Sequence, residues 1–348
     1  MKARIAFPLL LGTVAVAAVW AQHAPTPREA LLVLSKGNHT LAIVDPATLK
    51  VVATMPSGED PHEVACDDQG RVAYITNYGT GRGGYNTLTV ADLVEQKPLP
   101  TIDLGPLRGP HGIWFAAGKV YFTAEINKVI GRYDPATRRV DWIMGTGQNI
   151  THMIKATPDG SRIFTSNILS GSVTMMESFT QVGMKATRFS PGANDWRVTS
   201  LTVGDPNEEY EGFDVSPDWK ELWTASPRGN VAVVDTASNK LLQVLDAKVV
   251  GANRVKFTPD GRYVLVSSLA GQAGGNIVVF DAATRKEVKR IAAGTGAGGI
   301  VMQPDGARAY ASCSRDGYVA VIDLKTMSMI GKIDAGPTPD GLTWMVRR

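Results

Sequence analysis

One strand-rich unit of roughly 45 residues recurs along the chain, and this repeat limits the possible folds more than any other feature. The clearest copy, Asn253 to Gly294, holds four short apolar runs separated by a Pro-Asp-Gly turn, a polar loop and an Asp-x-x-Thr turn. Asp and Gly suit such turns because they tolerate positive φ and bond their own backbone. Helical periodicity is absent, so we predict repeated four-stranded β units. The two turn markers recur at Pro158, Pro217, Pro304, Asp45, Asp134, Asp235 and Asp323.

The residue that comes just before the first strand of each unit, here the anchor residue, sets the period. Successive anchor residues are 49, 41, 59, 42, 45 and 42 residues apart. Four short strands at this period are typical of the blade of a β-propeller. The seven anchor residues are His62, His111, His152, Glu211, Asn253, Gly298 and Asp340.

The two ends of the repeat region together complete one unit. Ala30 to Ser57 holds three strands without a first strand, and Gly341 to Val346 supplies one lone strand. Pairing the C-terminal strand with the N-terminal strands closes the ring and removes exposed sheet edges. We therefore predict an all-β, seven-bladed β-propeller with four-stranded blades over residues 30–348.

The N-terminus has the pattern of a secretory signal. Lys2 and Arg4 precede an apolar run from Ile5 to Trp20, and Ala21 offers a cleavage site. We predict a signal peptide over residues 1–21 and a short linker over 22–29, with an uncleaved N-terminal anchor as the alternative. The mature chain, without a transmembrane span, is then periplasmic or extracellular. Its small net charge argues against binding to nucleic acid, and we expect a monomer.

Tyr74-Ile75-Thr76-Asn77 resembles the signature of the bacterial YVTN-type β-propeller repeat proteins, and Val215-Ser216-Pro217-Asp218 resembles another part of that repeat. The resemblance covers nearly all of residues 30–348. It implies the propeller fold and a location outside the cytoplasm, and the family's roles vary. Propellers of similar architecture include surface-layer proteins, lactonase-like proteins and the haem domain of cytochrome cd1 nitrite reductase. Fold alone does not determine function.

The anchor residues carry the clearest functional pattern. Three consecutive units place a histidine there, His62, His111 and His152, and the next unit places Glu211. Anchor residues of neighbouring blades converge on the mouth of the central channel. Neutral imidazoles and a carboxylate are good ligands for zinc, copper, iron or nickel, so we predict a divalent transition-metal site. The alternative is that each imidazole bonds a backbone carbonyl and caps its blade.

Other polar residues should surround the same mouth. Asn253 and Asp340 continue the anchor register. The loops between second and third strands should lie on the same face, and they carry Glu125, Arg228 and Arg315. Cationic groups there suit a carboxylate or phosphate. We predict that Arg228, Arg315, Asn253 and Asp340 bind a small molecule or a protein at the channel face.

Three functions remain open at this point. The first is an exported binding or scaffold protein with a polar, metal-binding channel mouth. The second is a metal-dependent, lactonase-like hydrolase or lyase that uses the histidine and carboxylate ring, and the third is a cell-surface interaction module. Nucleophile-elbow, P-loop and dinucleotide motifs are absent, as is Cys-x-x-Cys-His, so the sequence does not determine whether the protein is an enzyme.

The predicted signal peptide gives a direct test. We expect the native protein to begin near Gln22, because a small residue at Ala21 follows the apolar run. Mass spectrometry of protein purified from its native compartment measures this N-terminus. An intact Met1 would show that the segment is retained.

Overall fold

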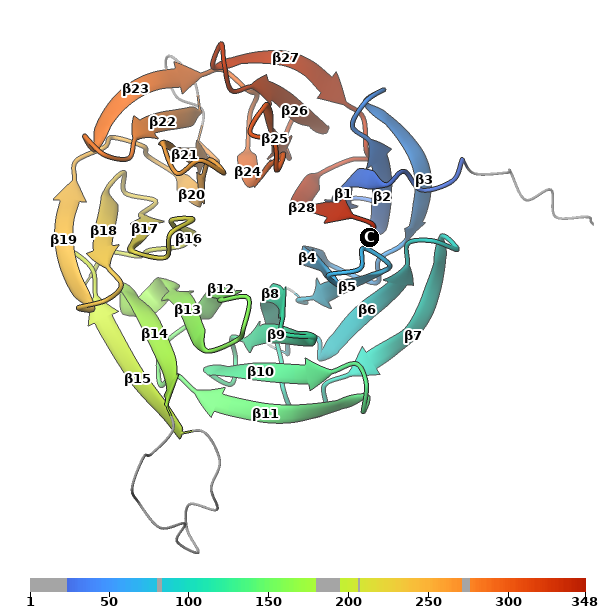
Figure 1. The fold of residues 1–348 in the computed structure, drawn as a ribbon, viewed down its shortest axis with the longest axis horizontal. Helices are drawn as coiled ribbons and strands as arrows, with labels where there is room; N and C mark the ends of the chain where they lie inside the picture. The colour runs from blue at the N-terminus through green and yellow to red at the C-terminus, as the bar shows by residue number, and fades with distance from the viewer. Residues whose placement is uncertain (1–23, 80–82, 180–194, 206, 271–275) are drawn as a thin grey trace, which may run out of the picture.

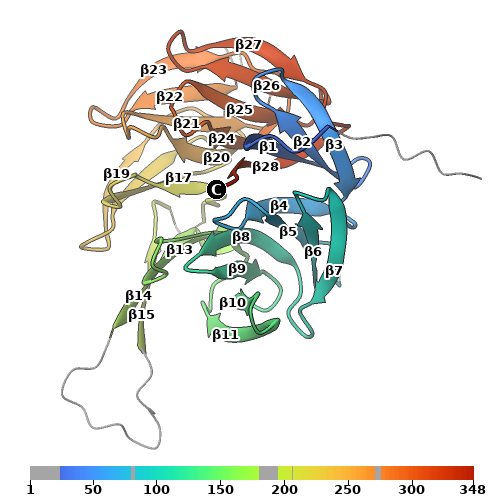
Figure 2. The same ribbon diagram turned by 45° about the vertical axis from the view of Figure 1, so that its right-hand side comes forward.

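The chain folds into seven four-stranded antiparallel sheets arranged around one central axis, which confirms the predicted seven-bladed β-propeller (Figure 1). This is a computed structural model, and it describes residues 24–79, 83–179, 195–205, 207–270 and 276–348. The innermost strands surround the axis and the outermost strands form the rim, as the tilted view also shows (Figure 2). The inserted loop near Gly183 and the centre of the loop after Gly79 lie outside the described residues.

Each blade runs from an inner to an outer strand. The first three blades contain β4 (Pro61–Cys66), β5 (Val72–Asn77), β6 (Thr87–Asp92), β7 (Lys97–Asp103); β8 (Pro110–Ala116), β9 (Lys119–Ala124), β10 (Val129–Asp134), β11 (Arg139–Gly145); and β12 (Thr151–Ala156), β13 (Arg162–Asn167), β14 (Ser172–Phe179), β15 (Asp195–Thr202). The next three contain β16 (Phe213–Val215), β17 (Glu221–Ala225), β18 (Val231–Asp235), β19 (Lys240–Leu245); β20 (Ala252–Phe257), β21 (Tyr263–Ser268), β22 (Ile277–Asp281), β23 (Lys286–Ile291); and β24 (Ala297–Met302), β25 (Arg308–Cys313), β26 (Tyr318–Asp323), β27 (Ser328–Ile333).

The seventh blade joins the two ends of the chain, as predicted. β28 (Pro339–Val346) pairs antiparallel with β1 (Glu29–Ser35), which is followed by β2 (Thr40–Asp45) and β3 (Lys50–Pro56). Beyond β28, the amide of Arg347 donates to the carbonyl of Arg28. This pairing leaves no inner strand of the ring without its neighbour in the same blade.

The turn markers have the local structure that their residue types favour. In the Asp-x-x-Thr turn, Asp281 accepts hydrogen bonds from both the amide and the hydroxyl of Thr284. Arg285, the next residue, has a φ of 57° and donates its amide to the carbonyl of Asp281. In the Pro-Asp-Gly turn, Gly261 has a φ of 72°, a conformation that costs glycine little. The same turn geometries repeat in other blades and fix the strand register.

The apolar core lies between neighbouring sheets. Trp223 of β17 packs against Phe257 of the next blade, with ring centroids 6.0 Å apart. Tyr310 of β25 likewise packs on Trp344 of β28, at 5.7 Å. Each interface between blades is therefore a small core of its own, as expected for a repeat architecture.

A buried hydroxyl connects each of four blades to the next. Thr123 of β9 accepts a hydrogen bond from the Gly112 amide in its own blade and donates one to the His152 carbonyl in the next blade, at 2.9 and 2.7 Å. Both bonds are shielded from water because Thr123 is fully buried. The anchor carbonyls of neighbouring blades are therefore held at fixed positions. The equivalent donors are Thr76 to His111, Ser166 to Glu211 and Ser267 to Gly298.

Glycine after the anchor residue allows neighbouring inner strands to approach closely. A Cβ atom on Gly112 would lie 2.4 Å from the carbonyl oxygen of His152. The same contact occurs between Gly212 and Asn253, at 2.2 Å. Gly299 and Gly341 meet the next anchor carbonyl in the same way. Where this residue is not glycine, as at Glu63, Met153 and Arg254, a side chain is available to fill the channel.

The anchor residues lie inside the inner strands, which corrects their expected position just before the strand. His62, for example, is the second residue of β4. The strand starts early because a register shift between Pro61 and Val64 interrupts its pairing with β5. Such bulges re-aim side chains next to functional sites. Six blades carry this shift, and only Glu211 precedes its strand, β16.

Both cysteines are free thiols. Cys313 is buried and Cys66 is half-buried, and burial raises the pKa of each thiol to about 12. Within the ranges that the structure describes, no helix has the length and apolar character needed to cross a membrane.

Ring closure by β28 can be tested by truncation. Removal of residues 338–348 should expose the edge of β1 and cause association, because an unpaired strand edge recruits other strands. Size-exclusion chromatography with light scattering measures this. Removal of Arg348 alone, which loses one backbone bond to Gln69, is the control. A monomeric longer truncation with unchanged melting would contradict the role of closure.

The hydroxyl connection between blades gives a second test. Thr123→Val keeps the shape of the side chain but removes the donor to the His152 carbonyl, so the free energy of unfolding should fall by about 1–2 kcal/mol. Thr101→Val, on the exposed strand β7, should change it by less than about 0.5 kcal/mol. Denaturant titration compares the two variants, and equal values would show that the bond carries no stability.

Candidate metal centre

The three anchor histidines lie side by side at one mouth of the channel. The ring centroids of His62 and His111 are 4.8 Å apart, and those of His111 and His152 are 3.8 Å apart. All three side chains are buried. They line a cavity of about 370 Å³, here the histidine cavity, together with Glu125, Glu211 and Arg254.

Glu125 completes a compact group with two of these histidines. It follows β9 in the turn to β10, and its carboxylate meets His152 Nδ1 at 2.5 Å. The other carboxylate oxygen accepts a hydrogen bond of 2.5 Å from the Tyr78 hydroxyl. One ligand atom from each of His111, Glu125 and His152 lies within 4.8 Å of the other two. Two imidazoles and a carboxylate are a ligand set that suits a divalent transition metal.

Two imidazole nitrogens in this group are buried without a partner. Within the described ranges, His111 Nδ1 and His152 Nε2 have no hydrogen bond. Unpaired buried polar atoms are rare and costly in native proteins. The pKa of His111 lies well below its usual value because of burial first and then the proximity of His152 and His62. His111 is therefore a neutral imidazole at neutral pH, which is the form that binds metals.

His62 has a different environment from the other two histidines. Its Nε2 lies 2.8 Å from the Nζ of Lys36, and its Nδ1 lies 3.1 Å from the carbonyl oxygen of Asp60. Lys36 also pairs with Asp340 at 2.7 Å. Burial and the charge of Lys36 lower the pKa of His62. In this arrangement the Nε2 lone pair accepts a hydrogen bond from the Lys36 ammonium, so it is not free to bind a metal.

Glu211 lies on the other side of the group. Its Oε1 is 3.8 Å from His152 Nε2 and accepts a 2.6 Å hydrogen bond from Asn253. Arg254, the next residue, forms a 2.6 Å ion pair with Glu63 of the first blade, across the channel. Arg254 lines the histidine cavity, whereas Glu63 lines a second cavity. The Arg254–Glu63 pair therefore separates the two cavities.

The predicted ligand-binding residues divide into two pairs. Asn253 and Asp340 line the histidine cavity. Arg228 and Arg315 are exposed and are not among the residues that line it, although Ser314 is. The structure therefore brings together His62, His111, His152, Glu211, Asn253 and Asp340. The roles of these residues, and of the two arginines, stay predictions.

Sequence reasoning did not include Glu125 or Tyr78 among the ligands. Both residues directly follow the second strand of their blade, at the equivalent place in β5 and β9. Because loops at this place in the repeat lie at the channel mouth that carries the anchor histidines, the repeat alignment could have indicated both residues as neighbours of the metal site. Their pairing with each other depends on contact between neighbouring blades, which one blade's sequence does not reveal.

Comparison with known families gives one partial match. The Cytochrome D1 heme domain family matches residues 191–306, about a third of the chain, from β15 to β24. This family is a β-propeller family, in agreement with the fold. No curated protein matches the chain in sequence.

The channel does not fit a haem group. The matched residues 191–306 contain no histidine, a common axial ligand of haem, and the channel histidines His62, His111 and His152 all lie outside the match. The Arg254–Glu63 pair also crosses the channel and divides it into cavities of about 370 Å³ each. We derive no chemistry through haem for this chain.

Several solved structures share the fold at low sequence identity. A protein of unknown function from Desulfotomaculum acetoxidans has a TM-score of 0.70 at 11% identity, covering 92% of this chain and 99% of its own. Hydrazine synthase from Kuenenia stuttgartiensis gives 0.66 at 17%, covering 90% and 99%. A candidate 6-phosphogluconolactonase from Bacteroides uniformis gives 0.70 at 14%, covering 91% and 99%. These similarities concern the fold alone.

Proposed function

We propose that this chain is an exported β-propeller of the YVTN type that binds a divalent transition-metal ion at one channel mouth. His111, Glu125 and His152 are the proposed ligands. One observation carries the proposal: three buried ligand groups from two neighbouring blades meet within 4.8 Å, and two of their nitrogens have no partner. An ion with bonds of about 2.0–2.2 Å would draw them together and give those nitrogens a partner.

The charges of the cavity favour a cation. Because Arg254 is paired with Glu63, Lys36 remains as the cation that balances three lining carboxylates, Glu125, Glu211 and Asp340, and neutral histidines leave two negative charges in excess. A bound divalent ion neutralises this excess. Metal binding here requires neutral imidazole and ionised carboxylate, so the affinity should fall as the pH is lowered through the titration of the ligands.

Two arrangements of Glu125 around the ion agree with the geometry, and they differ in which carboxylate binds the metal. It could bind the metal directly, or it could hold the proton on His152 Nδ1 and leave Nε2 free for the ion. In the second arrangement Glu211, 3.8 Å from that Nε2, supplies the carboxylate ligand. His62 would join only if Lys36 moved away.

We infer a binding role for the histidine cavity because three protein ligands leave a coordination position for a small molecule. Asn253 and Asp340 border that position, whereas Arg228 and Arg315 would contact a ligand only if it extended beyond the cavity. Export is supported by the apolar segment after Lys2 and Arg4. A lactonase-like reaction and a cell-surface interaction remain alternatives to pure binding.

The test is titration of the full protein with Zn²⁺ by calorimetry after treatment with a chelator. His111→Ala and His152→Ala should each weaken Zn²⁺ binding by more than about tenfold, because each removes a ligand. Comparison of Glu125→Gln with Glu211→Gln identifies the carboxylate that binds the metal, because the variant that lacks the ligand should lose more Zn²⁺ affinity. His62→Phe should have the smallest effect of the cavity variants.

His39→Ala is the matched control, because His39 is exposed and lies outside the histidine cavity. The variants should keep the far-ultraviolet spectrum of the parent, since the blades are held by their own cores. Absence of Zn²⁺ binding, or equal binding by the His111, His152 and His39 variants, would contradict the proposed site.

A further inference from the structure

A second cavity lies at the opposite mouth of the channel. It is lined by the later residues of the inner strands, including Trp114, Phe257, Met302 and Trp344, and is here the aromatic cavity. Its volume is about 370 Å³, which lies in the range of small-molecule pockets. The Arg254–Glu63 pair separates it from the histidine cavity, so ligands at the two mouths do not share space.

All but one of the charged side chains that line the aromatic cavity are paired with an opposite charge, and the exception is a cation. Lys155 forms a 2.6 Å ion pair with Asp214, and Glu63 is paired with Arg254. Asp214 also accepts hydrogen bonds from the amides of Val215 and Phe257, so both of its oxygens are engaged. Within the described ranges, Lys256 has no hydrogen bond or ion pair. The cavity therefore presents a single ammonium without a contacting counter-charge.

The position of this ammonium makes an anion favourable. Burial is the main influence on Lys256 and lowers its pKa, while the charge of Asp214 opposes this. A charge in such surroundings is costly unless it is paired. Trp344 lines the same cavity, and its indole nitrogen is buried without an acceptor among the described residues. An anionic oxygen would give either group a partner.

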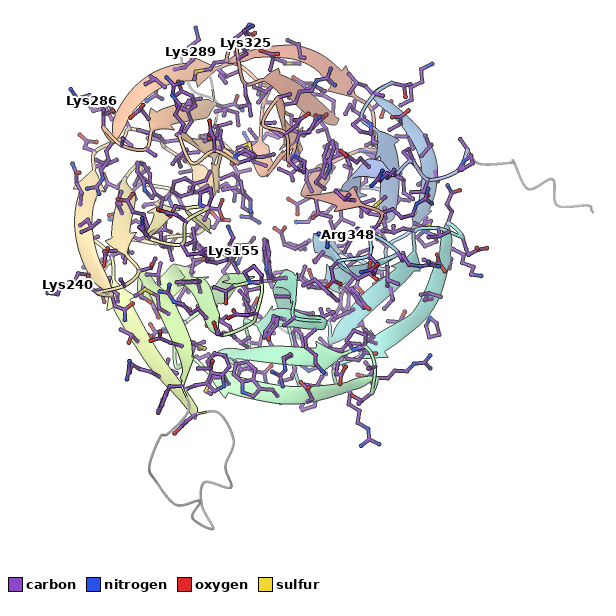
Figure 3. The ribbon with its side chains drawn as sticks, in the orientation of Figure 1. Lys155, Lys240, Lys286, Lys289, Lys325 and Arg348 are labelled. Atoms are coloured by element: carbon purple, nitrogen blue, oxygen red, sulfur yellow. The ribbon has the colours of Figure 1, made fainter. Side chains whose placement is uncertain are left out.

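The apolar lining indicates the rest of the ligand. Lys155 lies over the rings of Trp114 and Trp219, with its Nζ at 5.6 and 5.3 Å from the centroids. Figure 3 shows Lys155 beside the central opening, whereas Lys240 lies on the outer rim. The cavity is also lined by the rings of Phe115, Phe213 and Phe257, against which a flat apolar group can pack.

We propose that the aromatic cavity binds an organic monoanion with a planar apolar body, such as an aromatic carboxylate, through Lys256. The carboxylate pairs with the Lys256 ammonium, and the apolar body lies among the aromatic and aliphatic side chains. This site is independent of the metal centre, and the two cavities have no lining residue in common.

The probe is 2-naphthoate, compared with its neutral analogue 2-naphthamide, titrated into the full protein and followed by calorimetry. We expect saturable binding of the carboxylate and binding at least about tenfold weaker for the amide, because only the anion pairs with the ammonium. Saturating Zn²⁺ should leave the affinity for 2-naphthoate unchanged, because the two cavities are separate.

Two variants test the charge argument. Lys256→Met removes the ammonium while keeping the side-chain length, and should weaken 2-naphthoate by at least about tenfold while changing 2-naphthamide little. Lys155→Met leaves Asp214 free to neutralise Lys256, and should also weaken 2-naphthoate. Lys240→Met, on the exposed start of β19, is the matched control and should bind as the parent does.

Several results would overturn the proposal. They are no saturable binding of 2-naphthoate, equal binding of acid and amide, unchanged affinity in a folded Lys256→Met protein, or displacement of the probe by Zn²⁺. If Lys256→Met does not fold, the comparison of acid with amide in the parent and the Lys155→Met titration still decide the question. None of these outcomes bears on the metal centre, which is tested with its own variants.

Discussion

The hydrogen bond from a buried hydroxyl to the anchor carbonyl of the next blade is the contact on which the channel mouth depends. Thr76 and Thr123 each join the inner strand of their own blade to that of its neighbour. Because the acceptor is the carbonyl of a histidine, the same bond that joins two blades also fixes an imidazole. The same interaction therefore contributes to stability and to site geometry, and the rings of His111 and His152 lie 3.8 Å apart.

The residue after the anchor then decides what fills the channel. Gly112 lets the carbonyl of His152 come close, and the blades pack without a side chain between them. In the first and fifth blades, Glu63 and Arg254 stand at this position and meet across the axis. One repeat position thus serves either as a close backbone contact or as a charged group, and this choice varies from blade to blade while the fold is kept.

The fold could be predicted from the repeat because the sequence of each blade contains the residues that form its own turns and strands. Turn residues such as Asp281 and Gly261 act locally, so their effect can be read without the rest of the molecule. The meeting of His62, His111 and His152 followed from their shared register. The contact of Lys36 with His62 could not be predicted, because it depends on how the last blade closes against the first. The same holds for Arg254 and Glu63, whose positions differ by 191 residues.

The Arg254–Glu63 pair also determines how the central channel is divided. With the pair in place, the channel holds two separate cavities, one at each mouth, with the Arg254–Glu63 ion pair between them. The two faces can then change their ligands separately over evolutionary time, with a single buried ion pair as the partition between them.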